Sequence, residues 1–284
     1  MKVLVTGAGG MLAQAVIPAL TDAGHTVTAH ARATLDVTRL DDVRRAVEAA
    51  RPDWVCHLAA ATNVDGCESD VENAFLVNGV GARNASAAAY EAGAAVLAVS
   101  TDYVFPGHEP TPRREYDAIG PVSVYGRSKW AGECGVRETN PRHAIVRTAW
   151  LYGQGGRNFV DTIRAKALAG GPLAVVDDQH GAPTWTADLA AALVTLMERG
   201  ARGTLHATNA GACTWHEFAV EICRLAGASI DVATLSSAAL ARPAQRPAWS
   251  VLDLGTLEHV LGRPMPHWRD ALARYMAQPV PARV

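Results

Sequence analysis

Short apolar or β-branched runs alternate with segments of helical spacing through the first half of the chain. Strands are predicted at residues 3–6, 26–29, 54–58, 95–100 and 144–147. Between them, residues 12–23 stop before Gly24 as a helix would, and apolar residues recur at helical spacing over 43–50 after Asp41-Asp42. Because most strand runs are continuously apolar, we expect an α/β fold, a doubly wound parallel sheet buried by helices on both faces.

The pattern loosens after about residue 150, with Gly155-Gly156 and a proline-rich stretch at 242–247. A smaller C-terminal α/β lobe is expected there. Helices are predicted at 187–199 and after Thr214, whose spacing to Glu217 is that of a capping box. We expect residues 1–150 to form the first domain, completed by part of 174–208, and 151–284 to form mainly the second.

Composition narrows the class of protein. The 284 residues are 49% hydrophobic and 19% charged, with a net charge of −2, which suits a globular chain with a full core. We expect no nucleic-acid partner, because a basic footprint is missing, and no membrane partner, because no long uncharged apolar run occurs. The N-terminus lacks the features of a signal peptide, which predicts a cytoplasmic protein. Five scattered cysteines predict free thiols and no metal site.

A glycine-rich turn follows the first predicted strand and opens the first helix. It carries Gly7, Gly10, Met11 and Leu12. Glycines at this place let the backbone approach a pyrophosphate, which the helix N-terminus attracts. The turn therefore favours a dinucleotide site, and a purely structural tight turn is the alternative.

The end of the second strand bears on which dinucleotide binds. Proteins selective for NAD usually place an acid there, whereas this chain has Arg32, a cation suited to a 2′-phosphate. NADPH is therefore favoured over NADH; a solvated surface arginine is the other interpretation. Asp36 and Val37 follow, and Asp36 either approaches the adenine or only starts a turn or caps the helix at Leu40.

Candidate catalytic residues are Thr101, Tyr125 and Lys129. Tyr125 and Lys129 are four residues apart, so a helix places them on one face, in a chain with only three lysines. A phenol can give a proton to the oxygen of a carbonyl being reduced, and a nearby ammonium lowers its pKa. Thr101 ends a predicted strand, at the edge where such sheets bind ligands. The alternative is a surface Tyr/Lys pair.

These motifs resemble the extended short-chain dehydrogenase/reductase family and, within it, the dTDP-4-dehydrorhamnose reductase family. The resemblance runs nearly end to end, through Ser100-Thr101-Asp102-Tyr103-Val104-Phe105, Arg147-Thr148-Ala149-Trp150 and Ser250-Val251-Leu252-Asp253. It implies a Rossmann domain that binds NADP and a second domain for a sugar nucleotide. It also implies that the cofactor contacts Gly10, Met11, Leu12, Asp36, Val37, Ala60, Ala61, Thr62 and Val99, and that Thr101, Asp102 and Trp150 meet the sugar. The alternative interpretation is that Trp150 is an ordinary aromatic residue of the core.

The activity implied by the resemblance is reduction of the C4 ketone of dTDP-4-dehydro-L-rhamnose by NADPH, with Tyr125 as proton donor and Lys129 as its partner. A reductase for another dTDP-deoxysugar is the nearest alternative, and a non-catalytic regulatory subunit on the same fold is a more distant one. An epimerase or dehydratase is disfavoured by Arg32. Some relatives form a metal-bridged dimer through an acidic residue in the first helix. The segment Leu12-Ala13-Gln14-Ala15 offers no carboxylate, so we expect a monomer or a homodimer without metal.

Overall fold

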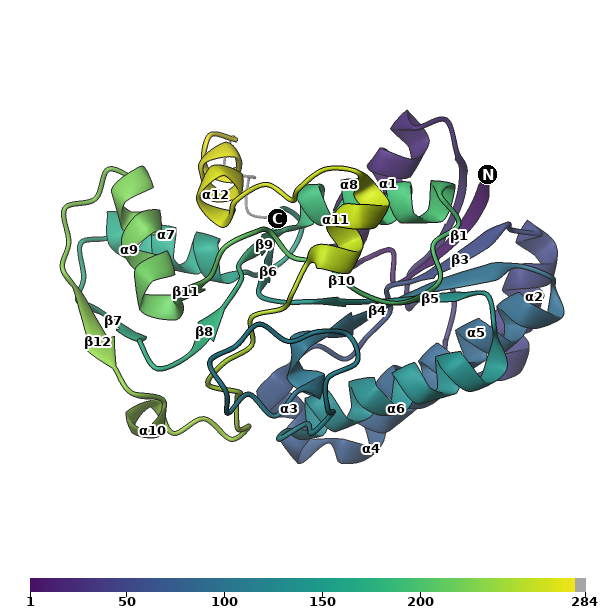
Figure 1. Cartoon of the computed structure of the whole chain (residues 1–284), viewed down its shortest axis with the longest axis horizontal. Coiled ribbons are helices and arrows are strands. Elements are labelled where there is room, and N and C mark those ends of the chain that lie inside the picture. Colours follow the sequence, from purple (N-terminus) through teal and green to yellow (C-terminus); the bar gives the residue numbers. More distant parts are fainter. Residues whose placement is uncertain (279–284) are drawn as a thin grey trace.

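A six-stranded parallel sheet forms the centre of the computed structural model, which describes residues 1–278 (Figure 1). Its strands are β1 Lys2–Thr6, β2 Thr26–His30, β3 Trp54–His57, β4 Ala95–Thr101, β5 His143–Thr148 and β10 Gly203–His206. They run in the order β10-β5-β4-β3-β1-β2. The five strands predicted from the sequence are confirmed. Chain order reverses at β1, which pairs with β2 on one side and β3 on the other.

Helices cover both faces of this sheet, because successive strand residues point to opposite sides. Val3 and Val5 pack towards α1 Ala13–Asp22, α8 Thr186–Glu198 and α11 Gly255–Leu261. Leu4 packs with α2 Leu40–Ala50, α5 Gly81–Glu91 and α6 Val124–Thr139. The doubly wound fold is thus confirmed. Strand β2 departs from the apolar expectation: it lies at the sheet edge and each of its residues is partly or fully exposed.

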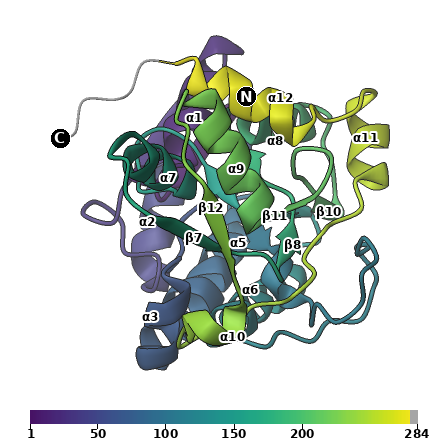
Figure 2. The same cartoon turned by 90° about the vertical axis from the view of Figure 1, so that its left-hand side faces the viewer.

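A second lobe packs beside the carboxyl end of the sheet, at the left in Figure 1 and facing the viewer in Figure 2. Its core gathers apolar residues of α7 Phe159–Leu168, β7 Leu173–Val176, α9 Trp215–Leu225, β12 Val232–Leu235 and α12 Trp268–Met276. Three two-stranded ladders complete it, formed by β7 with β12, β8 His180–Gly181 with β11 Cys213–Thr214, and β6 Leu151–Tyr152 with β9 Thr184–Trp185. Short helix α10 Ser237–Leu240 follows β12.

Short helical segments follow strands β3 and β4 at the carboxyl edge of the sheet. After β3 come α3 Val64–Ser69, α4 Val71–Phe75 and a π-helical turn, η1 Leu76–Val80, which leads into α5. After β4 comes one 3₁₀ turn, η2 Asp102–Val104. Within residues 1–278, no helix has both the length and the apolar character that crossing a membrane requires.

Candidate active site

One cavity of about 930 Å³ lies at the carboxyl ends of β1, β3 and β4, where chain order reverses. Ligands of doubly wound sheets bind at such a switch point. The cavity brings together every site residue predicted from the sequence: Gly7, Gly10, Met11, Leu12, Arg32, Asp36, Val37, Ala60, Ala61, Thr62, Val99, Thr101, Asp102, Tyr125, Lys129 and Trp150. Their clustering supports a shared site, while the role of each residue remains a proposal.

The glycine turn forms a tight cradle between β1 and α1. Gly7 has φ +74°, and a Cβ there would lie 2.6 Å from the backbone nitrogen of Ala59. The backbone nitrogen of Gly10 donates to the carbonyl oxygen of Gly7 at 2.9 Å, closing the turn. A side chain at position 7 would therefore push apart the loops that follow β1 and β3. Gly7 therefore lets these two loops pack together where they border the cavity.

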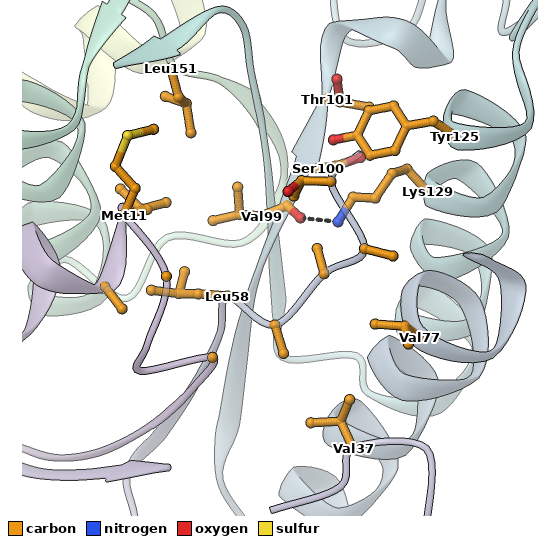
Figure 3. A pocket seen from close by; sticks show the side chains of 18 of the residues that line it. Met11, Val37, Leu58, Val77, Val99, Ser100, Thr101, Tyr125, Lys129 and Leu151 are labelled. Atoms are coloured by element: carbon orange, nitrogen blue, oxygen red, sulfur yellow. Dashed lines mark hydrogen bonds between the residues drawn. The ribbon is translucent and has the colours of Figure 1, made fainter. Parts of the chain in front are cut away.

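Helix α6 and the end of β4 position the three candidate catalytic residues (Figure 3). Ser123 caps α6, accepting a hydrogen bond from the Gly126 nitrogen, and Tyr125 and Lys129 follow one turn apart. Lys129 Nζ donates to the Val99 carbonyl oxygen at 2.7 Å. Figure 3 shows Thr101, Tyr125 and Lys129 on one side of the cavity, facing Met11 and Leu151. The candidate proton donor and the glycine turn therefore border the same space.

Burial is the main influence on the protonation of Tyr125 and Lys129. Burial raises the pKa of the Tyr125 phenol, the charge of Asp102 adds to this, and a hydrogen bond with Thr101 opposes it. Burial lowers the pKa of Lys129 to about 8, against the charge of Glu133. Desolvation is the largest influence on the pKa of Tyr125, and Lys129 is not among the groups that shift it here, so the role of Lys129 as the partner of Tyr125 stays a prediction. Tyr125 is thus protonated at neutral pH, the form that a proton donor needs.

Asp102 is a carboxyl group buried beside Thr101. Thr101 Oγ1 donates to Asp102 Oδ1 at 2.8 Å and accepts from the Tyr103 nitrogen at 3.2 Å. Burial raises the pKa of Asp102 to about 7, against several hydrogen bonds that favour the carboxylate. Asp102 therefore changes charge near neutral pH, within the site.

Arg32 and Asp36 lie at the other end of the cavity. Arg32 is exposed, and the salt bridges found within residues 1–278 do not include it. Asp36 Oδ1 accepts from Thr38 Oγ1 at 2.7 Å and from the Thr38 nitrogen at 3.0 Å, and both bonds lower the pKa of Asp36. The residue before α2 is Arg39, so Asp36 shapes a turn and does not cap the helix.

Trp150 lines the cavity and is not a core aromatic. Its side chain is half-buried at the junction of β5 and β6. Its backbone is left-handed, with φ +46°, a conformation rare for a bulky residue and found mostly where surroundings enforce it. Trp215 and Arg157, from the second lobe, also line the cavity. Sequence analysis missed both, because they lie far along the chain from the motifs that mark the site.

Asn78 is a further residue that sequence analysis missed. It lies on the π-helical turn η1 and is almost fully buried. Its side chain accepts from the Ala61 nitrogen at 2.8 Å and donates to the Ala61 oxygen at 3.1 Å and to Ser128 Oγ at 3.0 Å. Asn78 thereby ties the cavity wall at Ala61 to the helix that carries Tyr125. A buried amide between apolar helices gives no local pattern that predicts these partners.

A buried charge network supports the catalytic helix. Glu133, one turn beyond Lys129, accepts from Ser100 Oγ at 2.6 Å and from Arg147 at 2.9 and 2.8 Å. Arg137 adds a partly exposed bond to the same carboxylate at 2.7 Å. The network joins α6 to the ends of β4 and β5, and one of its members, Ser100, lines the cavity. Among residues 1–278, no cluster of three or more metal-ligating side chains occurs.

Fold and cavity together define the class: an extended short-chain dehydrogenase/reductase-like protein. The family model described as the RmlD substrate binding domain matches residues 1–280. The chain belongs to this family.

Relatives include a protein of Streptomyces griseus named dTDP-4-dehydrorhamnose reductase, 48% identical over 276 residues, covering 95% of this chain and 91% of the relative. A Streptomyces antibioticus protein named probable dTDP-4,6-dihydroxy-2-methyloxan-3-one 4-ketoreductase is 42% identical and covers 96% and 93%. The crystal structure of Bacillus anthracis dTDP-4-dehydrorhamnose reductase in complex with NADP superposes with a TM-score of 0.93 at 36% identity, covering 97% of this chain and 99% of that one.

Proposed function

We propose that this protein uses NADPH to reduce the C4 ketone of dTDP-4-dehydro-L-rhamnose, forming dTDP-L-rhamnose. The observation that carries the proposal is the convergence of Thr101, Tyr125 and Lys129 on the cavity that also contains the glycine turn. The S. griseus relative is named for this activity, and the B. anthracis structure contains NADP. The chemistry of the site residues and the similarity to these two proteins thus support the same reaction.

The residues present fit a dinucleotide. The glycine turn lines the cavity just before the start of α1, and Arg32 is an exposed cation that can meet a 2′-phosphate. We assign the pyrophosphate to Gly7, Gly10, Met11 and Leu12, with Asp36, Val37 and the wall from Ala60 to Thr62 beside the rest of the cofactor. When bound, NADPH supplies the hydride. NADH is the weaker candidate, because Arg32 has no 2′-phosphate to bind there.

The chain's own contribution is proton transfer and positioning. As the C4 oxygen gains charge, the Tyr125 hydroxyl gives it a proton, an effect typically worth roughly 10²–10⁴ in rate. Thr101 holds the reacting oxygen or the phenol by a hydrogen bond. Lys129, fixed by the Val99 carbonyl, places a cation beside the resulting phenolate. Asp102 and Trp150 meet the sugar.

A second candidate is reduction of another dTDP-4-keto-deoxysugar. It is favoured by the S. antibioticus relative, whose name denotes a different 4-ketoreductase. A panel of enzymatically prepared dTDP-4-keto sugars, assayed for NADPH oxidation with identification of each product, separates the two. Highest kcat/KM with the rhamnose precursor supports the first assignment, and preference for another ketone replaces it. No oxidation with any member would favour a non-catalytic subunit.

We further infer that the protein works in the cytoplasm as a monomer or homodimer, without nucleic acid or membrane. The net charge of −2 gives no basic surface for nucleic acid. The first turn of α1, which contains Gln14, has no carboxylate that could hold a metal between two subunits. We propose that residues 1–150, completed by part of 174–208, bind NADP, and that 151–284 bind mainly the sugar nucleotide. The packing of α8 on α1 and the pairing of β10 with β5 support this division.

A further inference from the structure

Two phenols from different elements meet at the wall of the cavity. Tyr103 lies on the 3₁₀ turn η2 that follows β4, and Tyr125 is the second residue of α6. Both line the cavity. Their ring centroids are 5.8 Å apart and their planes differ by 80°, so the rings meet edge to face, one of the arrangements that aromatic pairs prefer. The proposed proton donor therefore has a second phenol beside it in the same cavity.

The backbone beside the two rings is also in contact. Gly126 follows Tyr125 directly and is buried. A Cβ at this position would overlap the carbonyl oxygen of Tyr103 and lie 2.9 Å from Cβ of Pro121. The first turn of α6 therefore packs on turn η2 at the residue next to the phenol, and only a glycine permits so close an approach. A shift of Tyr103 would thus move Tyr125 through ring and backbone alike.

Hydrogen bonds hold the turn that carries Tyr103. The Tyr103 backbone nitrogen donates to Thr101 Oγ1 at 3.2 Å, and Thr101 Oγ1 donates to Asp102 Oδ1 at 2.8 Å. On the other side of Tyr103, the Val104 carbonyl oxygen accepts from the Gly120 nitrogen at 3.0 Å. Thr101 and Tyr103 therefore approach Tyr125 as parts of one fixed turn.

We propose that the ring of Tyr103 positions the Tyr125 phenol for proton transfer, and that the Tyr103 hydroxyl takes no part in the chemistry. The inference rests on the proposed function, which makes Tyr125 the proton donor. Burial raises the pKa of both phenols, so protonation does not decide between them. Lys129 follows Tyr125 by one turn of α6, whereas Tyr103 lies on a separate turn. Small displacements of a reacting group lower rates steeply, so a ring that holds Tyr125 in place contributes to turnover without touching the reacting atoms.

The test measures the turnover of Tyr103→Ala and Tyr103→Phe, each in the wild type and in the Tyr125→Phe background. Tyr90→Ala, at a position on α5 that is 53% exposed and outside the cavity, is the control. Calorimetry with dTDP-L-rhamnose and fluorescence with NADPH give the two Kd values. Thermal melting identifies any variant that is not folded; if Tyr103→Ala is one, Tyr103→Leu takes its place, because it removes the ring and keeps an apolar side chain.

Loss of the ring in Tyr103→Ala should lower kcat by roughly tenfold or more, with both Kd values within about twofold of wild type. Tyr103→Phe, which restores the ring, should recover most of the turnover, and Tyr90→Ala should match wild type. In the Tyr125→Phe background, Tyr103→Ala should lower kcat by less than about twofold further, because no proton donor is left to position.

An equal fall in kcat in both backgrounds, or loss of turnover in Tyr103→Phe, would overturn the inference. Unchanged kcat in folded Tyr103→Ala would do the same, whether or not its Kd for the sugar nucleotide rises. A wild type with no turnover on any dTDP-4-keto sugar would instead contradict the proposed function, on which the inference depends.

Discussion

Tyr125 lies where the helix start, the strand end and the cavity meet, and burial keeps its phenol protonated. Replacing it with phenylalanine removes one oxygen and little volume. We predict that Tyr125→Phe lowers kcat by roughly 100-fold or more, because the developing alkoxide loses its proton donor. The Kd for NADPH should change little. Tyr116→Phe, at a highly exposed position outside the cavity, is the matched control; near-normal turnover of Tyr125→Phe would remove this residue from the mechanism.

Arg32 is a second single side chain with a specific proposed contact, the 2′-phosphate of the cofactor. Arg32→Ala should weaken NADPH binding by about tenfold or more while NADH binding stays nearly constant, since NADH has no 2′-phosphate. Titration of both cofactors by fluorescence measures this. Arg39→Ala is the control, because Arg39 is also exposed but pairs with Asp42. Equal losses for both cofactors would contradict the assignment of Arg32 to the 2′-phosphate.

Asp102 makes the stability of the protein depend on pH. Its pKa is about 7 in the folded chain, raised by burial, against about 3.8 when exposed. Between these values the folded state binds more protons than the unfolded state, so this group's contribution to stability falls as pH rises from about 4 to 7. Relative to Asp102→Asn, the wild-type free energy of unfolding should fall by a few kcal/mol over that window in urea titrations. Parallel pH profiles of the two proteins would contradict the raised pKa.

At the scale of elements, strand β4 and helix α6 act as one unit because two polar side chains of α6 hold the strand end. Lys129 bonds the Val99 carbonyl, and Glu133 bonds Ser100 and Arg147. Thr101 follows directly after these anchored residues. The geometry of the site therefore depends on a carboxylate that never touches the cavity.

Glu133→Gln should lower the free energy of unfolding by about 3–5 kcal/mol, because it leaves the guanidinium of Arg147, 1% exposed, without its counter-charge. Glu138→Gln, an exposed carboxylate on the same helix, should change it by less than about 0.5 kcal/mol. Denaturant unfolding of both variants measures the difference. Similar small effects for both would show that the buried network does not stabilise the fold.

Helices and strands were predicted well where a single segment of the sequence contains the pattern that specifies them. The capping box at Thr214 and the apolar runs of β3, β4 and β5 specify their elements without help from distant residues. The two-residue strands of the second lobe gave no such signal, since pairs such as Leu151 with Thr184 form through tertiary contact. The stack of Trp150 on Trp215, with ring centroids 3.6 Å apart, was unpredictable for the same reason: the two residues come from segments far apart in the sequence.

At the scale of the whole molecule, an ion-pair cluster ties the first lobe to the C-terminal segment near the site. Asp65 on α3 accepts two bonds of 3.0 Å from Arg246, one of 3.0 Å from Arg242 and one of 3.2 Å from the Ala244 nitrogen. The Arg246 side chain is 17% exposed and that of Arg242 is 54% exposed. The two arginines should therefore contribute unequally.

We predict that Arg246→Gln lowers the free energy of unfolding by about 1–3 kcal/mol, as expected when a partly buried charged hydrogen bond is lost. Arg242→Gln should cost no more than about 1 kcal/mol, because exposed ion pairs contribute little. Chemical denaturation of the two variants side by side tests this order. The reverse order would contradict the predicted ranking, and no effect from either variant would show that the ion pairs of Asp65 do not stabilise the fold.

The sequence predicted the doubly wound sheet and part of its cavity, because glycine turns, strand ends and the Tyr-x-x-x-Lys spacing are local patterns. Other cavity residues, such as those at 60–62, Asp102 and Trp150, were predicted only from the resemblance to a known family. The upward shift of the Tyr125 pKa was not predicted, because a sequence carries no measure of how deeply the cavity excludes water. The links at Asp65, Asn78 and Trp215 depend on side chains brought together from distant segments. These contacts position the site, and they are known only from the folded chain.

The most direct measurement is NADPH oxidation at 340 nm by the wild-type protein with enzymatically generated dTDP-4-dehydro-L-rhamnose, followed by identification of the product. The account predicts rapid oxidation and stoichiometric formation of dTDP-L-rhamnose. Absence of oxidation, in a protein shown to be folded and to bind NADPH, would contradict the assigned reaction.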